Sequence, residues 1–334
     1  MDTDEKADFL AICMQCNLKK NVTKSTASLR INYRMFCNNL PLVSVICLSY
    51  QHEKFVERAL RSVIGQTYSN FEIIFIDNNS TDKSFEIGKA ILESSHAKFF
   101  VKKTPRNLGI AGGVNFAIKS FASGKYIATI ACDDFWDMYN LEEKVKYFEE
   151  NSSYGMLYGN GYYYFDDTKE IKLYYKKPSI SGFILKELLQ APPINPQGIL
   201  YRHDVIKELN YFDENAKVED RDLWYRIAEK YPIGYLHTPL TFYRSHTSNI
   251  SSNINYVREG NEYFFKKYED KFPNEIKKAR MKQERFFAYT MSKNSPTFKT
   301  LFKLISRFKF NWLYTKEVGR CFLLALKQLK PNNT

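Results

Sequence analysis

Short apolar runs alternate with amphipathic segments from residue 42 to residue 131, and this alternation constrains the fold more than any other feature. The segments between the runs place apolar residues at helical spacing, as at 55–64 and 110–121. The runs themselves have the β-branched and aromatic character of buried parallel strands, and they lie at 43–48, 73–76, 98–101 and 126–131. Strands that alternate with helices predict an α/β fold with a mostly parallel central sheet flanked by helices.

The sequence outside this alternation divides the chain into three regions. Residues 1–40 lack clear periodicity and end in a loop signal, so we interpret them as an N-terminal extension. A central domain is predicted over 41–254, with halves at 41–135 and 136–254. Residues 255–334 show only helical patterns and form a C-terminal helical basic region.

Composition excludes several classes of protein. The chain of 334 residues is 44% hydrophobic and 16% aromatic, which excludes wholesale disorder. No apolar stretch approaches the ~18–20 residues that cross a bilayer, and the acidic N-terminus lacks the features of a secretory signal. Six cysteines are too sparse for a disulfide framework, and Cys13 and Cys16 have no second CxxC pair to complete a zinc site. We therefore expect a cytoplasmic protein with reduced thiols.

The net charge of +12 is concentrated near the C-terminus. Residues 271–334 contain 15 Lys and Arg against 3 Asp and Glu, so residues 1–270 contain 34 of each sign and are neutral. This distribution is unlike that of a uniformly basic nucleic-acid binder. Basic amphipathic helices predicted near 299–309 and 316–329 favour contact with an anionic membrane surface. The alternative is a helical subdomain that packs on the body and leaves a solvated basic face.

Polar residues follow each predicted strand at the edge where ligands bind in open α/β sheets. The first strand leads to Ser49 and Tyr50, the second to Asp77, and the third to the loop 106–109. The fourth leads to Asp133 and Asp134, whose mutual repulsion a divalent cation with substrate phosphates would offset. The alternative is that Asp134 caps a helix and Asp133 is solvated.

The order of these motifs resembles the family-2 inverting glycosyltransferases of GT-A fold over roughly residues 41–250. The resemblance is carried by six segments in order, which are Val43–Tyr50, Ile76–Asp82, Asn107–Gly109, Gly124–Ile127, Asp133–Asp134 and Phe212–Arg226. It implies that 41–135 bind the nucleotide and that 136–254 bind the acceptor.

On the donor side, the resemblance implies residues that bind a nucleotide sugar. Asp77 would accept a hydrogen bond from the base N3–H, which favours a UDP- or dTDP-sugar. The full set of expected donor contacts is Ser49, Tyr50, Asp77, Arg106, Asn107, Gly109 and Asp133.

The resemblance also implies Mn²⁺ or Mg²⁺ at the diphosphate, held by Asp134 and approached by His246. Ala131 stands where the family commonly has another Asp, and Val114 where it often has Arg. Gly112 and Gly113 either allow close approach to the donor or pack a helix on the sheet.

On the acceptor side, Asp220 matches the family's general base, and Glu219 is its backup. Inversion needs one base opposite the leaving group to take the acceptor's proton. The alternative is a carboxylate that interacts with a helix dipole. Asn195 and Gln197 are expected to face the acceptor, whereas Leu223 and Trp224 are expected in the core.

These expectations describe an enzyme that transfers one sugar to a glycan acceptor, since the QxxRW element of processive synthases is absent. The acceptor would be a lipid-linked surface-polysaccharide intermediate, met at the inner face of the cell membrane, with no nucleic acid involved. A dehydrogenase is disfavoured because no GxGxxG follows the first strand. Two alternatives remain, a sugar-nucleotide pyrophosphorylase and a catalytically inactive α/β protein that binds RNA or membrane through its basic tail.

Overall fold

The computed structural model describes residues 40–190 and 194–294. The N-terminal extension, except Leu40, and the basic helices expected near 299–329 lie outside the described residues. No helix within the described residues is long and apolar enough to span a membrane.

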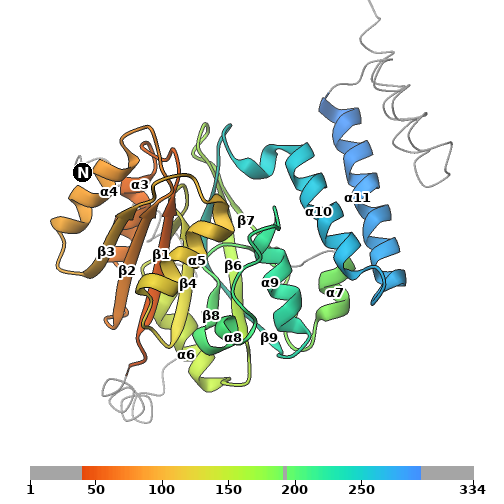
Figure 1. Ribbon diagram of the computed structural model, residues 1–334, viewed down its shortest axis with the longest axis horizontal. Coiled ribbons are helices and arrows are strands. Elements are labelled where there is room, and N and C mark those ends of the chain that lie inside the picture. The colour runs from red at the N-terminus through yellow and green to blue at the C-terminus, as the bar shows by residue number, and fades with distance from the viewer. Residues whose placement is uncertain (1–39, 191–193, 295–334) are drawn as a thin grey trace, which may run out of the picture.

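Nine strands of the described residues form one sheet, in the order β3-β2-β1-β4-β8-β6-β9-β5, with β7 paired to β6 (Figure 1). The first half is parallel, as the sequence predicts, and comprises β1 (Val43–Ser49), β2 (Phe71–Asp77), β3 (Lys98–Lys103) and β4 (Tyr126–Ala131). β1, β2 and β4 contain the predicted apolar runs because a strand buried on both faces is mostly apolar, whereas β3 is partly exposed.

The second half of the sheet is mixed rather than mostly parallel. Its strands are β5 (Phe135–Trp136), β6 (Met156–Phe165), β7 (Ile171–Leu173), β8 (Leu200–Arg202) and β9 (Ile233–Ser245). β8 runs antiparallel to both β4 and β6, whereas β9 runs parallel to β6 with register shifts near Asn160. β5 pairs antiparallel with β9 and thereby brings residues 135–136 next to residues 241–242.

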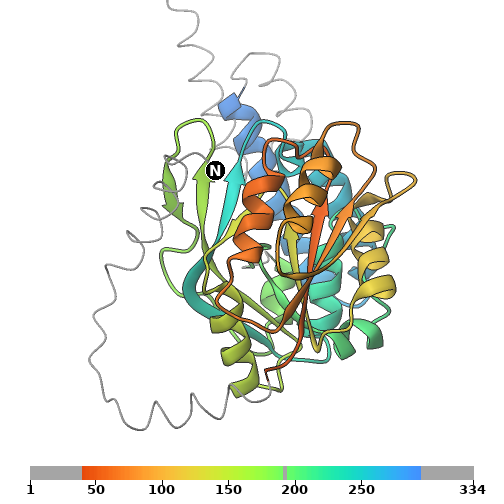
Figure 2. The same cartoon turned by 90° about the vertical axis from the view of Figure 1, so that its left-hand side faces the viewer.

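Helices cover both faces of the sheet (Figures 1 and 2). One face packs against α3 (Val56–Ile64), α4 (Ser84–Glu93) and α6 (Asn140–Glu150). The opposite face packs against α5 (Gly109–Phe121), α7 (Leu185–Gln190), α8 (His203–Glu208) and α9 (Glu219–Ala228). Neighbouring β1 residues follow this division, since Val45 belongs to the first core and Ile46 to the second. Leu223 and Trp224 are buried in the second core, as expected.

The chain after β9 packs onto this body. It forms the short 3-10 helix η1 (Ile250–Ser252), α10 (Ile254–Tyr268) and α11 (Pro273–Asn294). The Phe264 ring of α10 stacks on Tyr225 of α9 at 4.1 Å, and α11 buries Ile276 and Ala279. Apolar residues between 264 and 279 therefore share a continuous core with this body.

Close packing of α5 explains one of its glycines. A Cβ on Gly113 would lie 2.7 Å from Leu48 Cδ1 of β1 and 3.5 Å from Asn78 Nδ2. A contact as short as the first requires the Leu48 side chain or the helix to shift. Of the two explanations that the sequence left open for this position, packing of the helix on the sheet is the one that the structure supports.

Candidate active site

A cleft of about 290 Å³ opens beside the carboxyl ends of β1 and β4. Asp133 and Asp134, just beyond β4, line one part of it, and Glu219 and Asp220, at the start of α9, line another. Gln197 also lines this cleft. The fold thus brings together two acidic pairs that lie more than eighty residues apart in the sequence.

Asp133 faces two histidines. Its Oδ2 lies 3.2 Å from Nε2 of His246 and 3.8 Å from Nε2 of His52, while its Oδ1 is buried with no hydrogen-bond partner among the described residues. Burial alone would raise the pKa of this carboxyl, but the hydrogen bond with His246 and the nearby His52 hold the pKa below its ordinary value. Asp133 is therefore an ionised carboxylate with one oxygen available to a ligand.

Asp134 has a different environment. Its Oδ1 accepts a 2.7 Å hydrogen bond from the backbone N–H of Arg244, and the residue is only 2% exposed. Burial, together with the adjacent Asp133, raises the pKa of Asp134 well above its ordinary value. The Arg244 guanidinium donates to the Asp133 carbonyl and to Asp166 Oδ1, both at 2.7 Å. Asp134 thus ties the end of β4 to β9, whereas His246, the other residue expected at the metal, forms a hydrogen bond with Asp133.

The donor set of this site suits a divalent cation only with help from a substrate. Among the described residues, no group of three or more His, Cys, Asp and Glu side chains is arranged to hold a metal ion. Mg²⁺ and related hard cations are commonly held by one or two carboxylates plus substrate phosphates. The unpartnered Oδ1 of Asp133 fits this arrangement, whereas Asp134, with its hydrogen bond to β9, fits it less well.

A second polar group lies at the end of β2. Asp77 is fully buried, and its Oδ1 accepts a hydrogen bond of 2.8 Å from the Ser80 N–H. Its Oδ2 has no partner among the described residues, and neither has the buried Oγ of Ser49. Buried polar atoms are rarely left unpartnered, so an orphaned acceptor beside an orphaned hydroxyl is typical of a ligand site. Tyr50, next in the chain, is exposed.

The loop after β3 is organised by internal hydrogen bonds. Asn107 Oδ1 accepts from the Gly109 N–H at 2.8 Å and from Asn78 Nδ2 at 3.0 Å, and Gly109 has a φ of +74°. The Arg106 side chain is exposed and lines a separate hollow rather than the cleft that contains Asp133. The structure therefore does not bring Arg106 to the two acidic pairs.

Glu219 and Asp220 share an environment that disfavours their charged forms. Burial raises the pKa of Asp220, although a 2.6 Å hydrogen bond from the Arg221 N–H opposes this shift. Burial and the neighbouring Asp220 raise the pKa of Glu219 well above its ordinary value. A carboxylate whose pKa is raised is a stronger base than a solvated one, which suits proton removal near neutral pH.

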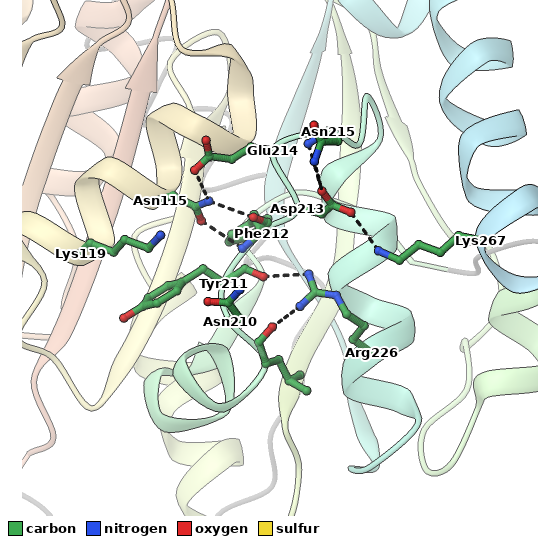
Figure 3. A pocket seen from close by; sticks show the side chains of 11 residues that line it. Asn115, Lys119, Asn210, Tyr211, Phe212, Asp213, Glu214, Asn215, Arg226 and Lys267 are labelled. Atoms are coloured by element: carbon green, nitrogen blue, oxygen red, sulfur yellow. Dashed lines mark hydrogen bonds and ion pairs between the residues drawn. The ribbon is translucent and has the colours of Figure 1, made fainter.

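The turn at residues 209–211, which precedes α9, is held by hydrogen bonds from Arg226 of α9 (Figure 3). Asn210 and Tyr211 both have left-handed backbone conformations, with φ of 58° and 63°. The Arg226 guanidinium donates to the Leu209 carbonyl at 2.5 Å and to the Tyr211 carbonyl at 2.8 Å. These bonds stabilise an unfavourable turn and hold it against the helix that contains Asp220.

The two residues expected at the acceptor have different positions. Gln197 lines the cleft, but Asn195 is buried beneath it, where its Nδ2 donates to Thr241 Oγ1 at 3.2 Å.

His52 was not expected at the site. Its position three residues after a strand end, in a chain with five histidines, was the only available signal.

Comparison with known proteins identifies the class. Residues 44–209 match the family model described as glycosyl transferase family 2. An uncharacterised glycosyltransferase of Methanocaldococcus jannaschii is 31% identical over 211 residues, which cover 61% of this chain and 71% of that protein. The chain is therefore a glycosyltransferase. It belongs to glycosyltransferase family 2.

Two further similarities bear on substrate and fold. The Escherichia coli protein WfaP, a UDP-Glc:alpha-D-GlcNAc-diphosphoundecaprenol beta-1,3-glucosyltransferase, is 30% identical over 219 residues, which cover 64% of this chain and 81% of that protein. The mannosyltransferase PcManGT from Pyrobaculum calidifontis, solved with GDP-Man and Mn²⁺, has a TM-score of 0.56 at 14% identity and covers 96% of this chain and 95% of that one. The second similarity supports the GT-A fold that the sequence predicts.

Proposed function

We propose that this enzyme moves one sugar, with inversion, from a UDP- or dTDP-sugar to a lipid-linked glycan acceptor. The observation that carries the proposal is the cleft lined by both Asp133 and Asp220. One acidic pair includes an oxygen of Asp133 that has no partner among the described residues and is suited to a cation, and the other pair has raised pKa values suited to a base. Inverting transfer requires these two functions within one site.

Asp133 is the residue best suited to hold Mn²⁺ or Mg²⁺, with His246 beside it. When bound, the cation stabilises the negative charge that develops on the departing diphosphate. Asp134 and Arg244 hold the backbone of Asp133 in place through the bonds described above. The use of Mn²⁺ in the structure of PcManGT supports the assignment of a divalent cation.

The transfer step assigns the proton to Asp220. The acceptor hydroxyl oxygen forms a bond to the anomeric carbon as the bond between that carbon and the diphosphate oxygen breaks, and the hydroxyl proton passes to the Asp220 carboxylate. The raised pKa supports this role, because a carboxyl with an ordinary pKa near 3.8 would accept the proton less readily. Glu219 shares the same part of the cleft and is suited to contact the acceptor.

Asp77 supplies the preference for the base. Its buried, unpartnered Oδ2 is an acceptor for the N3–H group of uracil or thymine. The UDP-glucose donor in the name of WfaP is consistent with this preference.

A donor screen tests the proposal. The full chain is incubated with Mn²⁺ and a panel of UDP-, dTDP-, GDP- and CMP-sugars, and release of the nucleotide is followed. We expect release from a UDP- or dTDP-sugar, loss of that release on chelation of the metal, and normal release from the exposed-carboxylate control Asp167→Asn. Release from none of these donors would contradict the proposal.

The lipid-linked acceptor and a peripheral membrane location are supported by the outer face of α11. Lys278, Lys282 and Arg285 are exposed there together with Met281 and Phe286, and Phe286 is 61% exposed. Basic residues interspersed with exposed apolar side chains favour binding to anionic lipid surfaces. The acceptor named for WfaP, a diphosphoundecaprenol-linked sugar, is of the kind found at such a surface.

Vesicle sedimentation tests this location. We expect the full chain to bind vesicles that contain 30% phosphatidylglycerol, at about 0.1 M salt, more strongly than vesicles of phosphatidylcholine alone. The Lys282→Ser, Phe286→Ser double variant should bind the anionic vesicles several-fold more weakly, since each cation near the surface contributes about 1 kcal/mol. Equal binding to both vesicle types would contradict the membrane location, and binding to RNA instead would favour the alternative.

A further inference from the structure

A lysine is buried in the body of the protein beneath the acceptor side of the cleft. Lys144 of α6 is 1% exposed, and its Nζ donates a hydrogen bond of 2.5 Å to the Gly198 carbonyl. It forms no salt bridge within the part of the chain that the structure describes. Burial lowers the pKa of its amine to about 7. A buried amine without a carboxylate partner is costly, so its single hydrogen bond demands a functional or structural reason.

Gly198, whose carbonyl accepts this hydrogen bond, has no room for a side chain. Gly198 has a φ of +59°, in the left-handed region that favours glycine. A Cβ at this position would lie 2.7 Å from Thr241 Cγ2 and 3.1 Å from both Lys144 Nζ and Trp136 Nε1. The lysine amine and the indole therefore occupy the space that any other residue at 198 would need.

The same loop is anchored at its other end. Asn195 Nδ2 donates to Thr241 Oγ1 at 3.2 Å, and Asn195 Oδ1 accepts from the Gln197 N–H at 3.2 Å. Between these anchors, Pro196 and Gln197 line the cleft together with Glu219 and Asp220. Pro196 and Gln197 of loop 194–198 thus line the same cleft as the acidic pair, and the loop is held from its other side by the Asn195 side chain and by Lys144.

We propose that Lys144 is a positioning residue that holds loop 194–198 through the Gly198 carbonyl, so that Gln197 faces the acceptor next to Asp220. The inference rests on the proposed function, because it assigns this part of the cleft to the acceptor. Acceptor binding is then controlled from α6, which lies on the far side of the loop and does not line the cleft.

The surroundings of Lys144 favour this role over that of a core-filling residue. The Trp136 indole N–H and both polar atoms of the Asn140 side chain, one turn earlier on α6, are buried without partners among the described residues. A core that only had to be filled would favour an apolar side chain at each of these positions. The buried polar atoms of Lys144 and Trp136 that lie against Gly198 instead indicate that the position of its carbonyl matters.

The first test measures the loop directly and needs no substrate. Hydrogen–deuterium exchange is compared at residues 194–199 and, as an internal reference, at 106–112 in Lys144→Met, Lys144→Arg and the full wild-type chain. Lys146→Met is the matched control, because Lys146 lies on the same helix and is exposed. We expect at least tenfold faster exchange at 194–199 in Lys144→Met alone, with the reference segment unchanged.

The second test separates donor from acceptor. The donor probe is UDP-glucose with Mn²⁺, and the acceptor probe is a GlcNAc-diphospho-lipid with a short tail. We expect Lys144→Met to raise the acceptor KM about tenfold, to leave UDP release without acceptor within twofold, and to be largely rescued by Lys144→Arg. A general loss of fold would instead reduce both reactions together.

Three results would overturn the inference. These are unchanged exchange at 194–199 in Lys144→Met, an unchanged acceptor KM, or an equal loss of transfer and UDP release. If Lys144→Met does not fold, Gly198→Ala tests the same contact from the loop, and it should change loop exchange and acceptor KM in the same direction. If the wild-type chain releases no UDP at all, the proposed function fails, while the exchange data still decide whether Lys144 holds the loop.

Discussion

The side-chain amide of Asn115 forms two hydrogen bonds with the backbone of Phe212, one to its carbonyl and one from its N–H. Asn115 Nδ2 donates to the Phe212 carbonyl at 2.9 Å, and the Phe212 N–H donates to Asn115 Oδ1 at 3.0 Å (Figure 3). Asn115 lies on α5, within the half 41–135, and Phe212 lies in the segment before α9. This pair therefore connects the part of the protein expected to bind the donor to the helix with Asp220.

Loss of this pair should destabilise the protein. Asn115→Ala leaves a buried N–H and a buried carbonyl of Phe212 without partners, which costs about 1–3 kcal/mol for each unsatisfied group. We expect the urea-induced unfolding free energy to fall by about 2–4 kcal/mol, while Asn215→Ala, at an exposed residue of the same turn, should change it by less than about 0.5 kcal/mol. Equal stability of the two variants would show that the amide pair contributes little.

Transfer should depend on pH through Asp220. Its pKa is raised by burial, and the base is active only when ionised, so activity should fall as the pH drops through this raised pKa, above the ordinary 3.8. Asp220→Asn should lower kcat by about 10²–10⁴-fold at neutral pH, the usual contribution of general base catalysis. The measurement is the pH profile of kcat. An acid limb at or below 3.8, or a variant as active as Asp167→Asn, would contradict this role.

Nucleobase preference should be determined by Asp77. In Asp77→Asn the free oxygen of the carboxylate becomes an amide N–H₂, which cannot accept from uracil N3–H but can donate to cytosine N3. Since hydrogen bonds to charged groups contribute about 1.5–3 kcal/mol, we expect UDP affinity to fall by about 10–100-fold. The ratio of CDP to UDP affinity, measured by calorimetry, should rise. An unchanged ratio of CDP to UDP affinity would show that Asp77 does not contact the nucleobase.

The parallel half of the fold could be predicted from sequence because its physical signal is local. Nearly all residues of the strands 43–49, 71–77 and 126–131 are buried, so their sequences are mostly apolar, with exceptions such as Glu72. The mixed half gave no such signal. β9 forms its register with β6 across seventy residues and includes shifts near Asn160 that no periodicity reveals.

The acidic pairs of the site could also be located from sequence, but their individual roles could not. The family resemblance assigns the metal to Asp134 and a donor contact to Asp133, whereas in the structure the Arg244 N–H, 110 residues away, partners Asp134 and leaves Asp133 with an oxygen that has no partner among the described residues. Lys144 illustrates the same limit. No motif in the sequence singles out Lys144, which is buried in the structure because the loop that ends in Gly198 packs over it.

The central claim is that a cation at Asp133 and the nucleotide diphosphate bind to the same site. Isothermal titration of UDP into the full chain, with and without Mn²⁺, tests this claim most directly, with Asp133→Asn and the control Asp167→Asn alongside. We predict that Mn²⁺ strengthens UDP binding at least tenfold in the wild-type chain and in Asp167→Asn, and that Asp133→Asn abolishes the gain. UDP binding that is indifferent to Mn²⁺, or a gain that survives in Asp133→Asn, would contradict the claim.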